Sequence, residues 1–415
     1  MIDIELIRKN PEIIKQAMLA KQYNPTIVDE VIKIDEKRRS LIRQIEELRA
    51  ERNQISSKLK DESSKLRGKK IKEELKKLEP QLKQSEADFI EVFNQIPNPP
   101  LAAVPKGKDE SDNVEVRKWG TPTKFDFKPK NHLELGRTLG ILDFETGAKV
   151  TGSQFYFLYN DGALLELALI QYAFNLLQKE GFIPVITPDL AKSRYYLGTG
   201  YLPKGTEAQT YEITNEDLGL IATAEVTLAG KHADEVIPEN QLPIKYIGYS
   251  HCFRQEAGAY GKYSKGLYRV HQFTKAEMFI YCKPEDSEKY HEHIVQMEEK
   301  IYQGLGIPYR VVEMCTGDLG AMAARKFDVE AWMPGRSEYG EVTSTSNCTD
   351  YQARNLNIKF RRKNGKTEFI HMLNGTAIAT SRTPLAILEN YQNADGSITV
   401  PDVLKPFLNK DIIKR

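Results

Sequence analysis

The feature that most constrains the fold of this sequence is a heptad pattern between residues 27 and 97. Residues 35–91 contain sixteen Lys or Arg and thirteen Asp or Glu, so about half of the segment is charged and an ordinary globular core is excluded. Apolar residues nevertheless recur there at spacings of three, four and seven. They are Ile27, Val31, Ile34, Leu41, Ile45, Leu48, Ile55 and Leu59, and then Ile71, Leu75, Leu78, Leu82, Phe89, Phe93 and Ile96. The pattern predicts two helices packed along one seam as a long antiparallel α-helical hairpin, a coiled coil.

The ends and breaks of these helices can also be predicted. We expect the hairpin to turn at the polar stretch SSKLRGKK, residues 63–70, which contains Gly68. Pro80 should kink the second helix or delay its start, because a proline inside a helix removes a hydrogen bond and crowds the preceding turn. Residues 3–22 predict one or two shorter helices with a break at Asn10-Pro11.

A proline-rich stretch separates this region from the rest of the chain. The segment IPNPPLAAVPKGKDESDN, residues 96–113, has no hydrophobic periodicity and is typical of a linker. We therefore expect an N-terminal domain at 1–97 with its helical arm at about 27–97, a linker at 98–120 and a second domain at 121–415.

The second domain mixes helical and strand patterns. Residues 163–180 have helical periodicity and end before Gly181, a suitable C-cap. Segments 243–256, 267–282, 309–314 and 359–373 are rich in β-forming residues, and the last reads as a hairpin around Asn364-Gly365. Because hairpin-like turns join most of these strands, we predict an α+β domain with an antiparallel sheet.

Composition excludes several classes of protein. Fifty-nine basic and fifty-eight acidic residues give a net charge of +1, so a nucleic-acid site must be a local patch. No apolar run approaches the roughly 18 residues of a membrane span, and the first residues lack a signal-peptide pattern. The four cysteines lie at least thirty residues apart, which predicts reduced thiols in the cytoplasm and no zinc cluster. The glycine-rich loops of P-loop and Rossmann proteins are missing, so a nucleotide site would need another architecture.

Charged and aromatic residues gather on the strands expected at 243–256 and 267–282. Residues two apart in a strand share a face, so Arg254 lies beside Glu256 there. The same rule puts these residues on one face of the next strand: Arg269, His271, Phe273, Lys275 and Glu277. Arginine matches phosphate oxygens, phenylalanine stacks on bases and carboxylates accept N–H groups. A solvated face with cross-strand ion pairs is the alternative, but so many of these residues on one hairpin favour a ligand site.

Three shorter patterns could belong to the same site. Glu341 and Ser344 offer oxygens that suit Mg²⁺ bound mainly through ATP phosphates, although such residues are also typical of turns. A small-residue turn before a helix that begins near Arg382 would favour a bound anion, where the alternative is a surface arginine. Thr223 and Glu225 are again two apart, which also fits a strand end or a helix cap.

Together these motifs resemble a known family. F-R-x-E followed by R-x-x-x-F is similar to motif 2 of class II aminoacyl-tRNA synthetases, and the turn leading to Arg382 is similar to motif 3. TAE at 223–225, the stretch 104–120 and the N-terminal hairpin resemble bacterial-type seryl-tRNA synthetases, and the resemblance extends over the whole chain. It implies a catalytic sheet of six to eight antiparallel strands, ATP in a bent form, and a homodimer through motif 1, which would run from 163–180 to Pro188.

The resemblance also implies a role for each site residue. Arg254 and Arg382 are the expected catalytic residues, on the α- and γ-phosphates of ATP. The nucleotide site would contain Arg254, Gln255, Glu256 on the adenine amino group, Val270, Phe273 stacked on adenine, Glu341, Val342, Thr343, Ser344 and Arg382, with Glu341 and Ser344 holding Mg²⁺. The serine site would contain Thr223, Ala224 and Glu225 around the ammonium group, Arg254, and Glu277 and Thr376 around the hydroxyl.

Two residues depart from the family's usual pattern. Thr343 and Thr376 stand where the family usually has serine, so we expect two additional methyl groups at the site. Thr343 keeps its hydroxyl, whereas the methyl group of Thr376 could tighten the serine pocket. The implied reaction is formation of seryl-adenylate from ATP and L-serine, followed by transfer to the 3′ end of tRNA(Ser); the resemblance leaves open whether tRNA(Sec) is also charged.

A basic patch near the hairpin tip is the expected contact for tRNA. Residues 58–77 carry nine basic side chains, Lys58, Lys60, Lys65, Arg67, Lys69, Lys70, Lys72, Lys76 and Lys77, against four acidic ones, a local net charge of +5. A solvated helix surface would be the ordinary interpretation of such a run. In the family, however, this arm binds the long variable arm of serine tRNA.

Three other functions would require different sequence features. A ligase of the same fold that charges a carrier protein would lack the long arm. A non-catalytic tRNA-binding paralogue would be expected to have lost one of Arg254, Glu256, Glu277 and Arg382, and all four are present. A coiled-coil scaffold would not need the ordered catalytic motifs.

Overall fold

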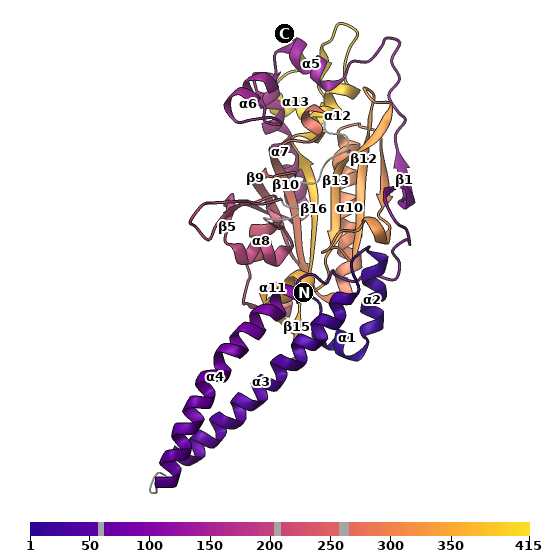
Figure 1. Cartoon of the computed structure of the whole chain (residues 1–415). Helices are drawn as coiled ribbons and strands as arrows, with labels where there is room; N and C mark the ends of the chain where they lie inside the picture. Colours follow the sequence, from indigo (N-terminus) through magenta and orange to yellow (C-terminus); the bar gives the residue numbers. More distant parts are fainter. Residues whose placement is uncertain (57–61, 203–208, 257–264) are drawn as a thin grey trace. The chain divides into compact units, whose positions relative to one another are not determined.

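The computed structural model describes residues 1–56, 62–202, 209–256 and 265–415. These residues form two compact units, Met1–Pro99 and Pro100–Arg415 (Figure 1). None of the helices in the described ranges is long and apolar enough to cross a membrane.

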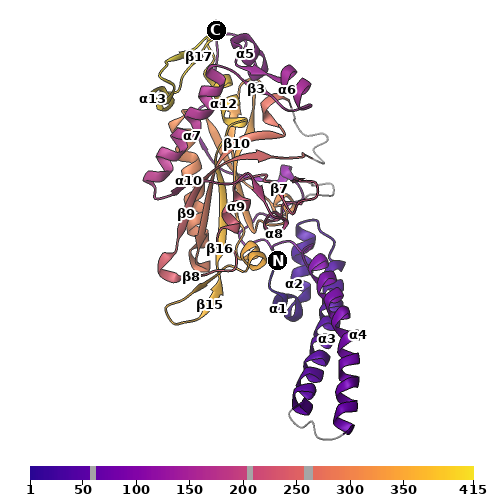
Figure 2. The same cartoon turned by 90° about the vertical axis from the view of Figure 1, so that its left-hand side faces the viewer.

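Over its described residues, 1–56 and 62–99, the N-terminal unit has four helices, α1 (Ile4–Lys9), α2 (Pro11–Ala20), α3 (Thr26–Ser56) and α4 (Glu62–Phe93). Helices α3 and α4 run side by side as the predicted antiparallel hairpin (Figure 2). Ile45, Ile71 and Leu75 are buried in the seam between them. The expected break also occurs, because Pro11 is the first residue of α2, where its missing N–H leaves no intrahelical bond unmade.

Two local expectations for the hairpin need correction. Gly68 lies inside α4, so the connection between the helices falls at 57–61, outside the described residues. A glycine inside a helix costs only about 1 kcal/mol relative to alanine, which packing along the seam can offset. Pro80 also lies within α4, on its exposed side, and the helix starts eighteen residues earlier at Glu62. A delayed start is therefore wrong.

The base of the hairpin is fixed by a buried carboxylate. Asp35 of α3 accepts hydrogen bonds from Nε and Nη2 of Arg8 at 2.8 and 2.9 Å and from Nη2 of Arg38 at 3.0 Å. The Arg38 guanidinium also lies 4.6 Å from the centre of the Phe89 ring on α4. Because a buried charge is stable only when paired, this cluster ties α1, α3 and α4 together.

The second unit contains an eight-stranded sheet in the order β1, β11, β12, β13, β16, β10, β9, β4. Neighbouring strands are antiparallel except β4 and β9, which confirms the predicted α+β fold. The strands are β1 (Val114–Trp119), β11 (Tyr309–Glu313), β12 (Arg325–Met333), β13 (Glu338–Asn347), β16 (His371–Ala379), β10 (Gln272–Cys282), β9 (Ile244–Phe253) and β4 (Ile183–Ile186). The stretch expected to be a linker thus includes an edge strand, β1; its prolines all precede that strand.

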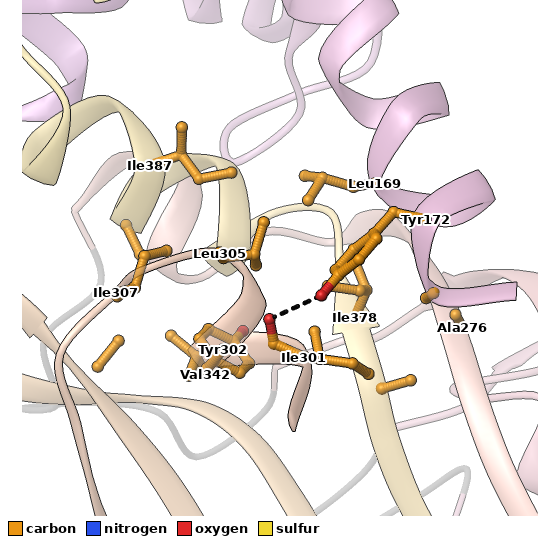
Figure 3. Packing of buried hydrophobic residues seen from close by; sticks show 14 of the residues in the cluster. Leu169, Tyr172, Ala276, Ile301, Tyr302, Leu305, Ile307, Val342, Ile378 and Ile387 are labelled. Atoms are coloured by element: carbon orange, nitrogen blue, oxygen red, sulfur yellow. Dashed lines mark hydrogen bonds between the residues drawn. The ribbon is translucent and has the colours of Figure 1, made fainter. Parts of the chain in front are cut away.

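The two faces of the sheet bury different sets of residues. Along β10, Ala276, Met278 and Ile280 belong to the core beneath α7 (Asp161–Lys179) and α10 (Ser287–Gly304), as the alternation of a strand requires. Phe279 and Tyr281 belong to a second cluster on the opposite face. Figure 3 shows the core around Tyr172, whose hydroxyl donates to the Ile301 carbonyl at 3.2 Å and so links α7 to α10.

Smaller elements complete the unit. The helices are α5 (His132–Leu139), α6 (Phe144–Val150), α8 (Ser193–Thr199), α9 (Glu225–Gly230), α11 (Tyr351–Leu356), α12 (Arg382–Asn390) and α13 (Lys405–Leu408). The short strands are β2 (Leu142–Asp143), β3 (Phe157–Leu158), β5 (Leu190–Ala191), β6 (Tyr211–Glu212), β7 (Gly219–Leu220), β8 (Val236–Pro238), β14 (Lys359–Arg361), β15 (Thr367–Phe369), β17 (Ile398–Thr399) and β18 (Ile412–Ile413). The hairpin expected around Gly365 is confirmed by β14 and β15, and Gly365 has the positive φ of 86° that its turn requires.

Candidate active site

A cavity of about 320 Å³ lies on the sheet face that α10 does not cover. Asn374 and Thr376 of β16 line it, whereas a Cβ at Gly375 between them would lie only 2.2 Å from Ile294 of α10. Strands β10, β13 and β16 form its floor, and this size suits a small-molecule ligand.

Arg254 and Glu256 reach this cavity by a route that differs from the predicted one. Strand β9 ends at Phe253, and Glu256 has a φ of +51°, so the two side chains are not placed by strand alternation. The Arg254 guanidinium lies 5.3 Å from the centre of the Phe273 ring, and Glu256 forms an ion pair with Arg269. All four residues line the cavity.

The predicted alternation does hold along β10 itself. Phe273, Lys275 and Glu277 line the cavity. Glu277 is 1% exposed; one of its oxygens lies 2.6 Å from Lys275 Nζ and accepts a hydrogen bond from the Thr376 hydroxyl at 3.2 Å. His271, expected on the same face, precedes the strand and instead contacts the Arg254 carbonyl at 2.8 Å.

A second buried carboxylate, Glu225, lies at the start of α9. It accepts hydrogen bonds from the Tyr201 hydroxyl at 2.7 Å, the Gln352 amide at 2.7 Å and the Asn374 amide at 2.9 Å. Burial, and next the nearby charge of Glu277, raise the pKa of Glu225, while the donors act against this shift. A cation entering the pocket would therefore meet two carboxylates.

Three residues expected at the site do not line the cavity. The Thr223 hydroxyl accepts from the Glu225 backbone N–H at 3.2 Å, so Thr223 shapes the start of α9. Ala224 is fully buried. The Gln255 amide donates to the Thr210 carbonyl at 2.6 Å.

A β-bulge brings Glu341 and Ser344 to the same face of β13. Glu330 pairs with Glu341 and Val329 with Thr343, so Val342 is an additional residue in the ladder. Glu341 and Ser344 line the cavity, and Ser344 lies opposite Asp328, its partner on β12. Thr343 also borders the cavity, but its side chain shares the core face with Val329.

Arg382, the first residue of α12, closes one side of the cavity. Its Nη1 lies 2.7 Å from a carboxylate oxygen of Glu341, and its Nε donates to the Tyr268 carbonyl at 3.2 Å. Burial alone would raise the pKa of Glu341, but the charges of Arg382 and Lys326 lower it to about 2. Glu341 is thus an anion at neutral pH.

Sequence reasoning missed several residues of the cavity. Tyr201, Gln352 and Asn374 hold Glu225 from three separate segments, and none of the three was given a role from the sequence. Residues 318–323 also line the cavity; Gly320 in that stretch is the one signal that could have indicated close approach of a ligand.

The chain is similar to known proteins over its entire length. Residues 209–391 match the family model of the tRNA synthetase class II core domain (G, H, P, S and T), and residues 1–100 match the seryl-tRNA synthetase N-terminal domain. A serine–tRNA ligase of Dictyoglomus turgidum is 54% identical over 98% of each chain, and one of Treponema denticola is 50% identical over all of both. The chain belongs to the seryl-tRNA synthetase family.

Solved structures of seryl-tRNA synthetases have the same architecture. The crystal structure of the enzyme from Pyrococcus horikoshii complexed with ATP has a TM-score of 0.92 and 41% identity, covering 100% of this chain and 99% of the other. A Giardia lamblia prolyl-tRNA synthetase, 16% identical with a TM-score of 0.58 over 69% of this chain, shares the fold alone.

The two departures from the usual seryl-tRNA synthetase pattern have different surroundings. Thr343 lies opposite Val329 of the core and also borders the cavity, so an additional methyl group at the site stays a prediction there. Thr376 remains in the pocket, where its hydroxyl donates to Glu277.

Proposed function

We propose that this chain is a serine–tRNA ligase that forms seryl-adenylate from ATP and L-serine and then transfers serine to the 3′ end of tRNA. One observation carries the assignment of both small substrates. A single cavity joins two arginines, Arg254 and Arg382, to two buried carboxylates, Glu225 and Glu277. The arginines match phosphates, and the carboxylates match an ammonium and a hydroxyl group.

The nucleotide would lie between Arg254, Phe273 and Arg382. Arg254 binds the α-phosphate, where negative charge grows as the serine carboxylate attacks, and Arg382 binds the γ-phosphate. Phe273 offers its ring to adenine, and Glu256, oriented by Arg269, accepts from the adenine amino group. The reaction then needs positioning and charge neutralisation rather than a protein nucleophile.

Glu341 and Ser344 would hold Mg²⁺. Among the described residues no group of three or more His, Cys, Asp or Glu could hold a metal by itself, which fits an ion bound largely through ATP phosphates. The ion would neutralise phosphate charge. Asp328 supports this assignment, because it lies opposite Ser344 in the ladder, where its carboxylate can orient the serine hydroxyl.

Serine would be recognised at both ends. Glu225 accepts from the ammonium group, and Glu277 with Thr376 contacts the hydroxyl. Alanine has no hydroxyl group and would leave Glu277 without a hydrogen-bond donor. Sites built around a substrate hydroxyl strongly reject an analogue that lacks it. Threonine would be excluded by shape, since the Thr376 methyl group takes up space in the same pocket.

The hairpin would bind the backbone of tRNA(Ser). Six lysines of the basic patch lie on α4 within the described residues, Lys65, Lys69, Lys70, Lys72, Lys76 and Lys77, whereas Lys58 and Lys60 lie outside them. Arg67 is held by Glu51, with Nε 2.7 Å and Nη2 2.6 Å from its carboxylate. Lysine contacts to phosphate recognise the shape of the RNA rather than its base sequence. The shape of tRNA(Sec) would therefore also decide whether that tRNA is accepted.

A homodimer through motif 1 is part of this proposal. Leu164 and Leu167 of α7 and Ile183 and Ile186 of β4 are exposed, Ile186 to 80%. Exposed apolar residues in one motif indicate a face that a second copy covers. Sedimentation of the purified chain at micromolar concentration tests this. We place the enzyme in the cytoplasm, where four buried, free thiols would stay reduced.

Two assays test the proposed function. Serine-dependent exchange of pyrophosphate into ATP separates an activating enzyme from a tRNA-binding paralogue. Transfer of serine to tRNA, compared with transfer to a carrier protein, separates the ligase from its carrier-charging relatives. Exchange without tRNA charging would overturn the second step while leaving the first intact.

A further inference from the structure

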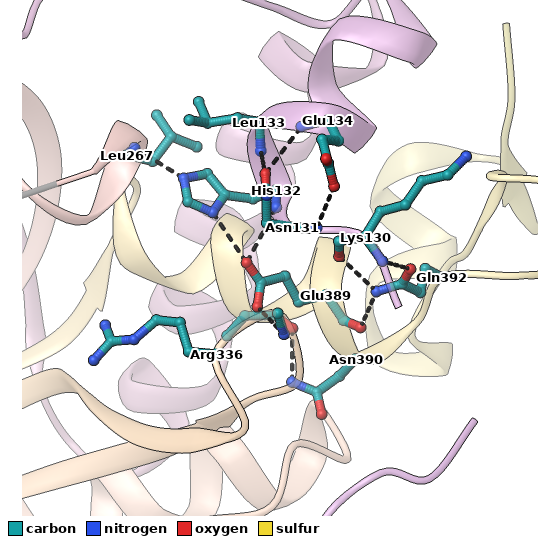
Figure 4. Close-up of polar contacts among 12 residues, drawn as sticks. Lys130, Asn131, His132, Leu133, Glu134, Leu267, Arg336, Glu389, Asn390 and Gln392 are labelled. Carbon is teal, nitrogen blue, oxygen red and sulfur yellow. Dashed lines mark hydrogen bonds and ion pairs between the residues drawn. The ribbon is translucent and has the colours of Figure 1, made fainter. Parts of the chain in front are cut away.

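A buried histidine lies outside the cavity and joins three elements around it (Figure 4). His132, at the start of α5, and Glu389, near the end of α12, both have side chains that are 1% exposed. The Nδ1 of His132 lies 3.0 Å from Glu389 Oε1, and its backbone N–H donates to the same oxygen at 3.1 Å. On the other side of the ring, the Leu267 backbone N–H donates to Nε2 at 3.2 Å.

These partners determine which ring nitrogen carries the proton. A backbone N–H can only donate, so Nε2 of His132 must be an acceptor. The proton is therefore on Nδ1, where it is donated to the Glu389 carboxylate. The opposite tautomer would place two donors against each other at Leu267.

Leu267 belongs to a segment that reaches the nucleotide side of the cavity. The carbonyl of the next residue, Tyr268, accepts from Arg382 Nε at 3.2 Å, and the Tyr268 ring lies 4.8 Å from the Arg382 guanidinium. Arg269 then pairs with Glu256. Gly266 has a φ of +61°, and a Cβ there would lie 2.3 Å from His132 Nε2, so the segment passes directly against the imidazole ring.

The Glu389 carboxylate also connects His132 to the turn between β12 and β13. Glu389 Oε2 accepts from the Gly335 backbone N–H at 2.9 Å, next to Arg336, whose guanidinium lies 5.0 Å from the Tyr268 ring. Helix α12 begins at Arg382 and carries Glu389 two turns later. Both ends of this helix thus meet the segment that holds Tyr268, one end through Arg382 and the other through His132.

We infer that His132, in its Nδ1–H tautomer, is a positioning residue for adenylate formation: it holds the Leu267 backbone so that Tyr268 and Arg269 orient Arg382 and Glu256 toward ATP. This rests on the proposed function, which assigns Arg382 and Glu256 to the nucleotide. Tyr268 contacts Arg382 and Arg269 pairs with Glu256, which are both assigned to the nucleotide, so the effect falls on ATP rather than on serine.

Two substitutions separate the two ring nitrogens. In His132→Asn the side-chain amide can occupy the place of Nδ1 and donate to Glu389, but nothing accepts from Leu267. In His132→Gln the longer side chain can place its carbonyl oxygen near Nε2 and keep the Leu267 bond while losing the donor to Glu389. Each variant removes one buried hydrogen bond, so both should lower the melting temperature.

The kinetics should distinguish them. In serine-dependent pyrophosphate exchange, His132→Asn should raise the KM for ATP about tenfold or more, as expected when a buried donor is left unpaired, with the KM for serine unchanged within about threefold. His132→Gln should lie much closer to wild type. Equal KM values for ATP in the two variants, or a larger defect in His132→Gln, would overturn the inference.

A spectroscopic measurement on the wild-type chain tests the inference even if a variant fails to fold. Ring ¹⁵N shifts of labelled histidine, with His132 assigned by its absence from either variant, should show a protonated Nδ1 and an unprotonated Nε2. A protonated Nε2 at neutral pH would contradict the inference. If the wild-type protein had no exchange activity, the proposed function would fail. The ¹⁵N shifts would still show whether His132 links Glu389 to Leu267 through its two ring nitrogens.

Discussion

Arg382 and Glu341 form an ion pair in the cavity, with Arg382 Nη1 2.7 Å from the Glu341 carboxylate. Our assignment gives these residues opposite partners, the γ-phosphate for Arg382 and Mg²⁺ for Glu341. Binding of Mg²⁺ and ATP should therefore replace this pair with two new charge contacts. The pair keeps both side chains oriented toward the cavity before the substrate arrives.

Glu341→Gln tests the metal assignment. The amide keeps the shape of the side chain but loses the charge that Mg²⁺ prefers, so the Mg²⁺ concentration for half-maximal pyrophosphate exchange should rise about tenfold or more. Glu330→Gln is the matched control, because Glu330 faces Glu341 across the ladder but is bound to Arg310 Nε at 2.6 Å. Equal Mg²⁺ dependence in the two variants would remove Glu341 from the metal site.

Arg254→Ala tests the catalytic assignment on the α-phosphate. The guanidinium meets charge that grows in the transition state, and removal of one such group costs roughly 10² or more in rate. Single-turnover formation of adenylate measures this step directly, with the melting temperature as the control for folding. A folded variant within a fewfold of the wild-type rate would show that Arg254 plays no part in the chemistry.

Glu277→Gln tests how the serine hydroxyl is recognised. The substitution replaces one acceptor by a donor in a pocket where Lys275 lies 2.6 Å from the carboxylate, so kcat/KM for serine should fall more than that for alanine. Glu225→Gln, by contrast, should weaken serine and alanine alike, because both carry the ammonium group. An unchanged serine-to-alanine ratio in Glu277→Gln would place the hydroxyl elsewhere.

Glu298 of α10 predicts how stability changes with pH. Burial raises the pKa of Glu298 well above its usual range. The folded protein therefore binds a proton that the unfolded chain releases above about pH 4.5. It follows that stability falls with rising pH between that value and the raised pKa, by up to about 1.4 kcal/mol per pH unit.

Glu298→Gln removes this proton linkage. Its melting temperature relative to wild type should therefore increase steadily from pH 5.5 to 8.5. Glu299→Gln is the control on the neighbouring residue; Glu299 accepts from Arg117 at 2.9 and 2.7 Å, so its neutralisation should destabilise the protein. A melting-temperature difference for Glu298→Gln that is constant with pH would mean that Glu298 is ionised in the folded state.

The hairpin prediction is tested by charge alone, with the seam intact. Changing the six described lysines of the α4 patch, Lys65, Lys69, Lys70, Lys72, Lys76 and Lys77, to glutamine should leave serine activation unchanged. The KM for tRNA should rise about tenfold or more, and its salt dependence should flatten because fewer counterions are released. The same change at Lys33 and Lys37, exposed on α3, is the control. If both sets behave alike, the patch is only a solvated surface.

Regular elements could be predicted because their periodicity is written in the sequence. The heptads gave the pair α3 and α4, and alternation along β10 gave Phe273, Lys275 and Glu277 on one face. Gly68 was misread as a turn because a local signal cannot show that packing elsewhere along α4 outweighs the cost of a glycine.

The irregular parts of the site could not be predicted in the same way. Arg254 and Glu256 follow the end of β9, where a left-handed residue replaces strand alternation, and the bulge at Val342 changes which residues of β13 share a face. Tyr201 and Gln352 meet Glu225 only after the chain has folded. Their hydrogen bonds join segments that are distant in the sequence, so no periodic pattern of residues indicates them.

The central claim is that this cavity activates serine and no other amino acid. Pyrophosphate exchange with wild-type protein, ATP and Mg²⁺ should be measured with each of the twenty amino acids in turn. We predict exchange with serine, with alanine and threonine lower by at least about two orders of magnitude in kcat/KM. Exchange that is equal or faster with another amino acid, or that is missing with serine, would contradict the assignment of Glu225 and Glu277 to the serine pocket.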